Sequence, residues 1–551
     1  MLSIYRLARL LPAAAILLFA RSAQSQSFLV QCPETTPYPS HPIAANGVTI
    51  PAGKTKCQQL SGGDGFATMA DGTQTYLFAF GPLSGMADIV KGLPGTMERP
   101  AFMQDNSGRS DVAIGAPTPN YAFNGAVGLI PDGGETGASG PLNGHVDPRL
   151  IMDVGTLNGS QPAPMMAIDE DDELFVTLTN VGQVMRPDLF EQHTVHFHGY
   201  PNASAYFDGV PDASIAINIG GSFTYYYLAP DAGTYFWHCH ITPPEHLQMG
   251  MVGQIFVRPR QNRLAPGTSL YAGLAVMQTD NRTKCDPTDP LCSHSLPPSN
   301  NGVTHQAGST YAYNDGDGST RYDVEYPIQL HGFDPNFHFV GMTFNPESFA
   351  DLKDKYFLIN GRSYPDTVGG YACASGDPWP ACAGKVEGEV VPGPMRTQGP
   401  DGVERTSQPQ ATVINIPAGG RALLRISDLN ITEMHTLGTL GIPMTVIGWN
   451  ARMLRDQDGN NLAYQTNSIT IGGGESGDVI LDACHERAAN GTCTTVGYTA
   501  GQKFYLYSPK LDHLSNDAEN FGGMMTEINI CDSVDPLSKQ CHIGSLVAGN
   551  F

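Results

Sequence analysis

The stretch Tyr235-Phe236-Trp237-His238-Cys239-His240 places one cysteine between two histidines, directly after a run of aromatic residues that favour a β-strand. The chain has 11 cysteines, and the other ten form five close sequential pairs that indicate disulfides. These pairs are Cys32 with Cys57, Cys285 with Cys292, Cys373 with Cys382, Cys484 with Cys493, and Cys531 with Cys541. Cys239 has no obvious partner, so it is a free thiol, an intermolecular link or a metal ligand. Its histidine neighbours favour the metal ligand.

The N-terminus and the cysteine pairs indicate an exported protein. Residues 1–25 carry Arg6 and Arg9, then an apolar run over residues 10–20 and small polar residues, which is the pattern of a cleavable secretory signal peptide. No later stretch is long and apolar enough to span a bilayer, and disulfides persist outside the cytoplasm. We therefore expect a periplasmic or extracellular location. The formal net charge of -23 opposes binding to nucleic acid and to anionic membranes.

The composition predicts an all-β protein with long loops. The chain of 551 residues contains 63 glycines, 42 prolines and short strand-like runs such as residues 174–178 and 503–507. We expect β-sandwich domains: residues 26–265 form the first, residues 320–551 the second, and residues 266–319 a linker or excursion between them. Within the first domain, the Gly-, Pro- and Asn-rich stretch 82–153 predicts a long irregular insertion.

Histidines concentrate in two strand-like segments that together hold six of the 16 in the chain. They are His193-Thr-Val-His196-Phe-His198-Gly199 and His238-Cys239-His240-Ile-Thr-Pro-Pro-Glu-His246-Leu-Gln-Met-Gly-Met251. Successive side chains on a strand point to opposite faces, so His196 and His198 share a face and His193 lies on the other. By the same alternation, His238 and His240 share a face and Cys239 points away from them. If the two strands are neighbours, two metal sites result.

The first predicted site combines a thiolate, two imidazoles and a thioether, which is the ligand set of a blue-copper electron-transfer centre: His193, Cys239, His246 and Met251. The second is an all-imidazole cluster suited to copper that reacts with oxygen or another small acceptor: His196, His198, His238 and His240. The peptide bonds of Cys239 join the two sites by a short covalent route for electrons. Zinc is the alternative for the first site, but no CxxC pair accompanies the lone thiolate. A surface histidine patch is the alternative for the second.

With these motifs the chain resembles the multicopper oxidases, a cupredoxin superfamily that includes laccases, metal-ion oxidases and, more distantly, copper nitrite reductases. The first histidine segment is similar to the family's HxxHxHG motif, residues 207–211 (Phe-Asp-Gly-Val-Pro) match its DGVP loop, and residues 233–251 are similar to its GTYxYHCH…H…GM signature. The resemblance implies cupredoxin-like Greek-key β-sandwich domains. It also implies a type 1 copper at the first site, and a type 2 or type 3 copper centre, or both, at the second.

The second half of the chain resembles a cupredoxin domain with few copper ligands. Family oxidases build a trinuclear centre from four HxH pairs contributed by two domains, whereas this chain has only two such pairs, both in the first domain. The segment Ser508-Pro-Lys-Leu-Asp-His513, followed by Gly522-Gly-Met-Met525, looks like a copper loop that has lost its HxH pair and its cysteine. The remaining second-domain histidines are expected to be structural or exposed: His331, His338, His435, His485 and His513.

These features predict an exported copper oxidoreductase. A small-molecule or metal-ion donor would give single electrons to the type 1 copper, and Cys239 would pass them to the histidine cluster, where dioxygen is the expected acceptor. A nitrite-reductase-like enzyme with type 1 and type 2 copper is one alternative, since the spacing from Cys239 to His246 is longer than in laccases. A non-catalytic type 1 electron carrier or copper-binding protein is the other. The resemblance also allows a homotrimer, in which one subunit's first domain meets the next subunit's second domain.

Overall fold

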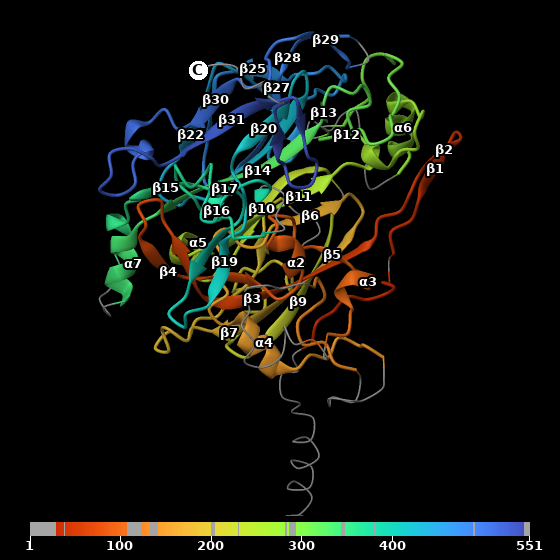
Figure 1. The fold of residues 1–551 in the computed structure, drawn as a ribbon. Helices are drawn as coiled ribbons and strands as arrows, with labels where there is room; N and C mark the ends of the chain where they lie inside the picture. The colour runs from red at the N-terminus through yellow and green to blue at the C-terminus, as the bar shows by residue number, and fades with distance from the viewer. Residues whose placement is uncertain are drawn as a thin grey trace, which may run out of the picture.

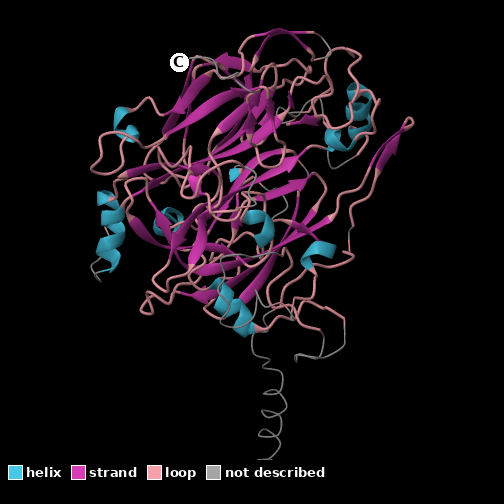
Figure 2. Cartoon of the chain, viewed as in Figure 1, coloured by secondary structure: helices cyan, strands magenta, loops and turns pink. Residues whose placement is uncertain are grey.

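The computed structural model describes most of the chain. The described residues are 29–37, 39–106, 109, 123–131, 141–199, 204–229, 231–280, 284–285, 292, 294–342, 348–377, 382–488 and 491–544. The predicted signal peptide, residues 1–25, lies outside them. Strands dominate this part of the chain and helices are few and short (Figure 2). Within these residues, no helix combines the length and the apolar character needed to cross a membrane.

Two sheets pack face to face around the first hydrophobic core. One sheet has the strand order β4-β3-β7-β9, with β5 paired to β3, and the other has the order β6-β11-β10-β8. Trp237 is fully buried between these sheets, and its ring centroid lies 5.2 Å from that of Phe80. We call this pair of sheets the first sandwich. Its strands are β3 (Thr55–Thr68), β4 (Gln74–Pro82), β5 (Met97–Glu98), β6 (Met166–Asp169), β7 (Glu173–Gly182), β8 (His196–Phe197), β9 (Ser222–Leu228), β10 (Gly233–His238) and β11 (Val252–Arg258).

The second half of the chain repeats the strand order of the first sandwich and extends both of its sheets with further strands. Its sheets have the orders β15-β14-β21-β27-β23-β24, with β25 paired to β23, and β20-β31-β30-β22-β26. The parallel pairs β14–β21 and β20–β31 correspond to β3–β7 and β6–β11, and the other shared pairs are antiparallel in both. We call this the second sandwich. Its strands are β14 (Val324–Phe333), β15 (Tyr356–Ile359), β20 (Ile414–Pro417), β21 (Arg421–Asp428), β22 (His435–Leu440), β23 (Met444–Trp449), β24 (Arg452–Met453), β25 (Tyr464–Thr466), β26 (Ser468–Ile471), β27 (Ser476–Asp482), β30 (Lys503–Tyr507) and β31 (Met525–Cys531).

Short helices and small hairpins decorate the two sandwiches. The predicted insertion 82–153 carries α2 (Met86–Ile89), α3 (Arg99–Phe102) and α4 (Pro148–Gly155), and the predicted linker carries α6 (Leu270–Met277). Elsewhere lie β1 (Ile43–Ala45), β2 (Val48–Ile50), α5 (Pro243–Gln248), η3 (Arg260–Arg263), β12 (Thr310–Tyr311), β13 (Arg321–Tyr322), α7 (Pro335–Met342), η4 (Phe349–Asp351), β16 (Gly370–Ala372), β17 (Val390–Pro392), β18 (Met395–Gln398), β19 (Glu404–Gln408), β28 (Cys484–Arg487), β29 (Cys493–Val496), η6 (Leu511–Leu514), β32 (Ser533–Val534) and β33 (Cys541–His542). All five predicted disulfides are confirmed.

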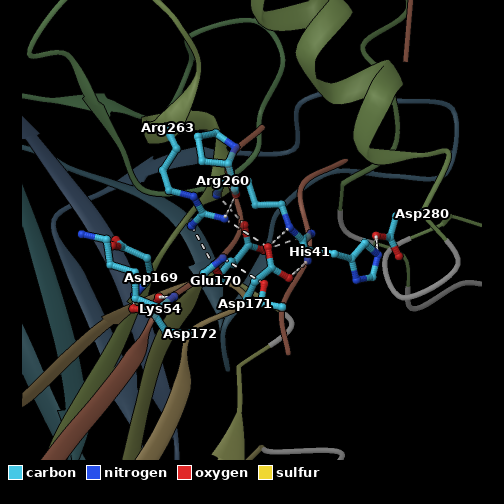
Figure 3. Close-up of polar contacts among 12 residues, drawn as sticks. His41, Lys54, Asp169, Glu170, Asp171, Asp172, Arg260, Arg263 and Asp280 are labelled. Atoms are coloured by element: carbon cyan, nitrogen blue, oxygen red, sulfur yellow. Dashed lines mark hydrogen bonds and ion pairs between the residues drawn. The ribbon is translucent and has the colours of Figure 1, made fainter. Parts of the chain in front are cut away.

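Polar contacts join the two sandwiches, which lie one above the other in Figure 1. Glu325 of the second sandwich receives Arg258 of the first at 2.6 Å and Arg425 of the second at 2.9 Å. A second buried cluster holds the turn between β6 and β7 against η3 (Figure 3): Asp171 pairs with Arg260 at 2.5 Å and with Arg263 at 3.1 Å. Buried charges are costly unless paired, so these networks fix how the sandwiches and their connecting segment pack.

Candidate metal centre

The two histidine-bearing strands are hydrogen-bonded neighbours, which confirms the adjacency that the sequence required. β8 and β10 pair antiparallel, with Phe197 opposite Trp237 and His196 opposite His238. The aromatic residues of the pair point into the sandwich core, where both are buried. Because side chains alternate along each strand, the histidines of the pair lie on the opposite face. Two pockets follow from this alternation, one on each side of β10.

The first pocket, which we call the thiol pocket, is closed to solvent. The ligand atoms of His193, Cys239 and His246 all lie within 4.8 Å of one another, and each residue is fully buried. The Nδ1 atom of His246 lies 3.3 Å from the Cys239 Sγ atom. Met251 is fully buried in the same core, and its carbonyl accepts the Cys239 N–H at 3.0 Å. The thiol and two imidazoles therefore meet in one place, and the backbone of Met251 lies beside them.

The thiol pocket contains unsatisfied nitrogen atoms that are available to bind a metal ion. Neither ring nitrogen of His193 has a hydrogen-bond partner among the described residues, although the ring is buried. A buried polar group without a partner costs free energy, which a metal–ligand bond would recover. Burial, with a smaller effect from His246, lowers the pKa of His193 well below its usual range, so this imidazole is neutral and keeps a lone pair for a metal. The donor set of thiolate, imidazole and thioether fits copper.

His246 has the opposite electrostatic environment. Burial alone would lower its pKa, but the Cys239 thiolate and the Glu191 carboxylate raise it to about 10. Glu191 Oε2 lies 3.6 Å from the Nε2 atom of His246. A cation is therefore favoured between the thiolate and this ring. A bound metal ion would supply that positive charge in place of a proton.

The second pocket, which we call the histidine pocket, lies on the other face of β8 and β10. The ligand atoms of His196, His198 and His238 lie within 4.8 Å of one another, and the two Nε2 atoms of His198 and His238 are 3.0 Å apart. The ring of His240 joins them, with its centroid 5.0 Å from that of His196 and 5.5 Å from that of His238. All four predicted imidazoles are therefore neighbours. The three-atom ligand group contains His196, His198 and His238.

Backbone carbonyls fix which nitrogen atoms face the histidine pocket. The Nδ1 atom of His196 bonds to the Asp208 carbonyl at 2.5 Å, and that of His238 bonds to the Cys239 carbonyl at 2.8 Å. A carbonyl can only accept, so each Nδ1 carries the proton and each Nε2 keeps its lone pair. Burial, with smaller effects from neighbouring imidazoles, lowers the pKa of His238 to about 3 and that of His198 to about 4. Neutral imidazoles with convergent lone pairs fit a metal ion.

The second sandwich contains a structural copy of the thiol pocket that sequence reasoning did not assemble. His435 and His513 are both fully buried, with ring centroids 5.3 Å apart. The His513 Nδ1 atom lies 3.3 Å from the Ser508 Oγ atom, the same distance that joins imidazole and thiol in the first sandwich. Ser508 N–H donates to the Met524 carbonyl at 2.9 Å, and Met524 N–H donates to the His513 carbonyl at 2.8 Å. Serine occupies the place of the cysteine.

In the pocket of the second sandwich, hydrogen bonds engage both ring nitrogens of His435, whereas the ring nitrogens of His193 in the thiol pocket have no partner among the described residues. The Nδ1 atom of His435 lies 3.3 Å from an Asp428 carboxylate oxygen, and its Nε2 atom lies 3.2 Å from the Asn430 side-chain nitrogen. Gly438 and Tyr507, which pair across β22 and β30, stand where the first sandwich has His196 and His238. In the described part of the chain, the only other three-ligand group is Cys285, Cys292 and His294, whose cysteines form a disulfide. His485 is exposed.

Comparison with known proteins places both pockets inside a family domain. The family model described as multicopper oxidase matches residues 144–262. Laccase abr2 of Aspergillus fumigatus is 34% identical over 112 residues, which are 20% of this chain and 18% of that protein. A copper-containing nitrite reductase of Neorhizobium galegae is 35% identical over 108 residues, or 19% of this chain and 26% of that protein. The chain thus spans about a fifth to a quarter of these relatives' lengths.

A solved structure resembles the chain over a longer range. The blue copper oxidase of Nitrosomonas europaea has a TM-score of 0.44 and 17% identity, and the similarity covers 86% of this chain and 85% of that one. The two ligand pockets lie between His193 and Met251, within the matched segment. Residues 144–262 of this chain match the multicopper oxidase family model, and this segment carries both pockets.

Proposed function

We propose that the chain is a copper-dependent oxidoreductase that takes single electrons from a small-molecule or metal-ion donor and delivers them to dioxygen. The observation that carries this proposal is the placement of the two pockets on opposite faces of one strand. Cys239 lies in the thiol pocket, and its sequence neighbours His238 and His240 lie in the histidine pocket. Copper held there would supply reversible one-electron oxidation and reduction. The family match over both pockets supports the same activity.

The residues of the thiol pocket would hold a type 1 copper and keep water away from it. His193, Cys239 and His246 have no exposed surface, and Met251, which is also fully buried, would supply the weak thioether ligand. A donor therefore meets the protein surface and not the metal ligands themselves. From Cys239, two peptide bonds lead directly to the imidazoles of the histidine pocket. This covalent path is the reason to expect electron transfer between the sites.

The histidine pocket would bind the electron acceptor. The number of copper ions that it holds would decide whether this acceptor is dioxygen or nitrite. His196, His198, His238 and His240 would hold the copper there, with Asp208 orienting His196 through its carbonyl. The second sandwich presents a glycine to this pocket: a Cβ atom added to Gly474 would lie 3.8 Å from the His198 ring. Within the described residues, the three-ligand group therefore holds only first-sandwich imidazoles. This favours a nitrite-reductase-like site with one type 2 copper as the second candidate function.

Copper analysis of the purified full-length chain distinguishes these functions. About one copper per chain indicates an electron carrier, about two indicate a reductase, and more indicate an oxidase. Oxygen uptake with a phenol, Cu(I), Fe(II) or Mn(II) tests the oxidase directly, and nitrite consumption with a reduced donor tests the reductase. Turnover with neither acceptor would refute both enzymes. An absence of any intense blue colour in the copper-loaded protein would refute the type 1 site.

Three further predictions belong to this proposal. The domain limits 26–265 and 320–551, with 266–319 between them, are tested by limited proteolysis, which should cut first inside the connecting segment. Export to the periplasm or the cell exterior is tested by sequencing the N-terminus of the mature protein. A homotrimer is tested by measuring the mass of the copper-loaded protein in solution.

A further inference from the structure

The loop between Cys239 and Met251 folds into α5, and this helix sets the positions of two predicted copper ligands. Thr242 precedes α5 with a left-handed φ of 37°. The Met251 N–H donates to the His246 carbonyl at 2.9 Å, which closes the loop onto β11. Gln248 is the last residue of α5 and is fully buried. It lies between His246 and Met251, so anything that holds Gln248 also holds both ligands.

The second sandwich and the segment that follows β14 hold Gln248 by its side chain. The Gln248 Nε2 atom donates to Asp354 Oδ1 at 2.6 Å. Its Oε1 atom accepts the Asp334 N–H at 3.1 Å and the His338 Nε2–H at 3.0 Å. Its backbone carbonyl accepts the His331 Nε2–H at 3.1 Å. Both the nitrogen and the oxygen of the Gln248 amide are therefore engaged, and His331 and His338 each bond to this residue through Nε2.

A chain of hydrogen bonds continues from Asp354 to His435, which lies in the pocket of the second sandwich. The other carboxylate oxygen of Asp354 accepts from the Thr432 hydroxyl. The Asn430 side-chain nitrogen lies 3.0 Å from that hydroxyl oxygen and 3.2 Å from the His435 Nε2 atom. Asn430 and Thr432 lie in the turn between β21 and β22, and His435 is the first residue of β22. The copper loop is therefore tied to a rigid part of the neighbouring sandwich.

We propose that Gln248 is a positioning residue for the thiol pocket, through which the second sandwich fixes the spacing of Cys239, His246 and Met251. The proposal rests on the copper site of the proposed function. Partners that orient a metal ligand are worth about 10- to 100-fold in metal affinity. Gln248 touches no ligand atom, so it acts through the backbone of its loop. The pocket of the second sandwich, in which Asp428 and Asn430 engage the His435 ring, then has a role as an anchor.

The test compares two buried glutamines that both bridge the sandwiches. Gln248→Leu removes the amide from the copper loop. Gln254→Leu is the matched control: Gln254 is fully buried on β11 and donates to the Arg425 carbonyl at 2.8 Å and to Ser427 at 2.9 Å, but it lies outside the ligand loop. We expect Gln248→Leu to shift the visible absorption and reduction potential of the blue centre and to weaken copper binding about tenfold in a chelator competition. Gln254→Leu should lower thermal stability without either spectral change.

A second pair of variants tests the same contact, so that the inference does not depend on whether Gln248→Leu folds. Gln248→Glu places a carboxylate against Asp354, so it should perturb the blue spectrum. Adding Asp354→Asn restores a donor–acceptor pair across that contact and should return the spectrum and potential toward the wild-type values. An unchanged spectrum in Gln248→Leu, equal spectral changes in both Leu variants, or no rescue in the double variant would overturn the inference. A wild-type protein that never turns blue would instead refute the proposed function.

Discussion

Gly62 offers a direct test of whether His193 is a metal ligand. Gly62 lies on β3 beside the imidazole, and a Cβ atom added there would sit 2.7 Å from the His193 Cδ2 atom and 3.3 Å from its Cγ atom. Ordinary contact begins near 3.4 Å, so Gly62→Ala must push the ring by about 0.7 Å. Metal–ligand distances tolerate only about 0.2 Å. The added methyl group also overpacks the core, at a cost of about 1–3 kcal/mol in the free energy of unfolding.

The expected result is a folded protein whose thiol pocket binds copper poorly. Gly62→Ala should lose or shift its blue absorption and contain less copper than the wild type, while its circular dichroism stays unchanged. Gly438→Ala on β22 is the control, because its nearest contact would be an ordinary 3.6 Å to the Asn467 carbonyl. Electronic absorption, electron paramagnetic resonance and metal analysis provide the measurements. A Gly62→Ala protein with wild-type spectra and full copper content would refute the assignment of His193 as a ligand.

Three other substitutions test separate parts of the reasoning. Cys239→Ser should abolish the blue colour, because no thiolate remains to bond the metal; a variant that stays blue contradicts the thiol pocket. His196→Ala should keep the colour but remove turnover, and bleaching instead would show that the two pockets are wrongly divided. Glu325→Gln should lower the free energy of unfolding at neutral pH, by less than the about 3–5 kcal/mol of a fully buried pair, because fully buried Arg425 and partly exposed Arg258 lose the carboxylate that they share. Burial raises the pKa of Glu325, but these two arginines lower it far below the usual 4.5, so its stabilisation is present above that pH and lost on acidification. Urea titrations at several pH values should therefore show a smaller acid loss in the variant.

The thiol and histidine pockets could be predicted because they depend on local strand geometry. Alternation along two short segments separates His193 from His196 and Cys239 from His238 without any knowledge of the rest of the fold. Only one long-range contact had to be assumed, the pairing of β8 with β10, and the structure provides it. The disulfides were similarly local, since each joins cysteines at most 25 residues apart.

The pocket of the second sandwich and its link to α5 could not be predicted in the same way. Ser508 and His513 stand in a recognisable loop, but His435 lies far earlier in the chain and carries no motif of its own. Its position depends on β22 pairing with β30, which is a tertiary property. Gln248 is equally silent in sequence, because a glutamine next to a ligand reads as an ordinary polar residue. The structure alone shows that its side chain bonds to Asp334, His338 and Asp354.

The two sandwiches together separate what a fold supplies from what a metal site requires. Each sandwich brings two imidazoles against an equivalent loop, and the backbone hydrogen bonds of the two loops match. The shared topology therefore forms the pocket in both. The ring nitrogens of His193 have no hydrogen-bond partner among the described residues, whereas the ring nitrogens of His435 are engaged by Asp428 and Asn430. Replacing Ser508 with cysteine would therefore restore a thiol but not a free imidazole. It follows that several residues, and not the cysteine alone, distinguish the thiol pocket from the hydrogen-bonded pocket of the second sandwich that anchors it.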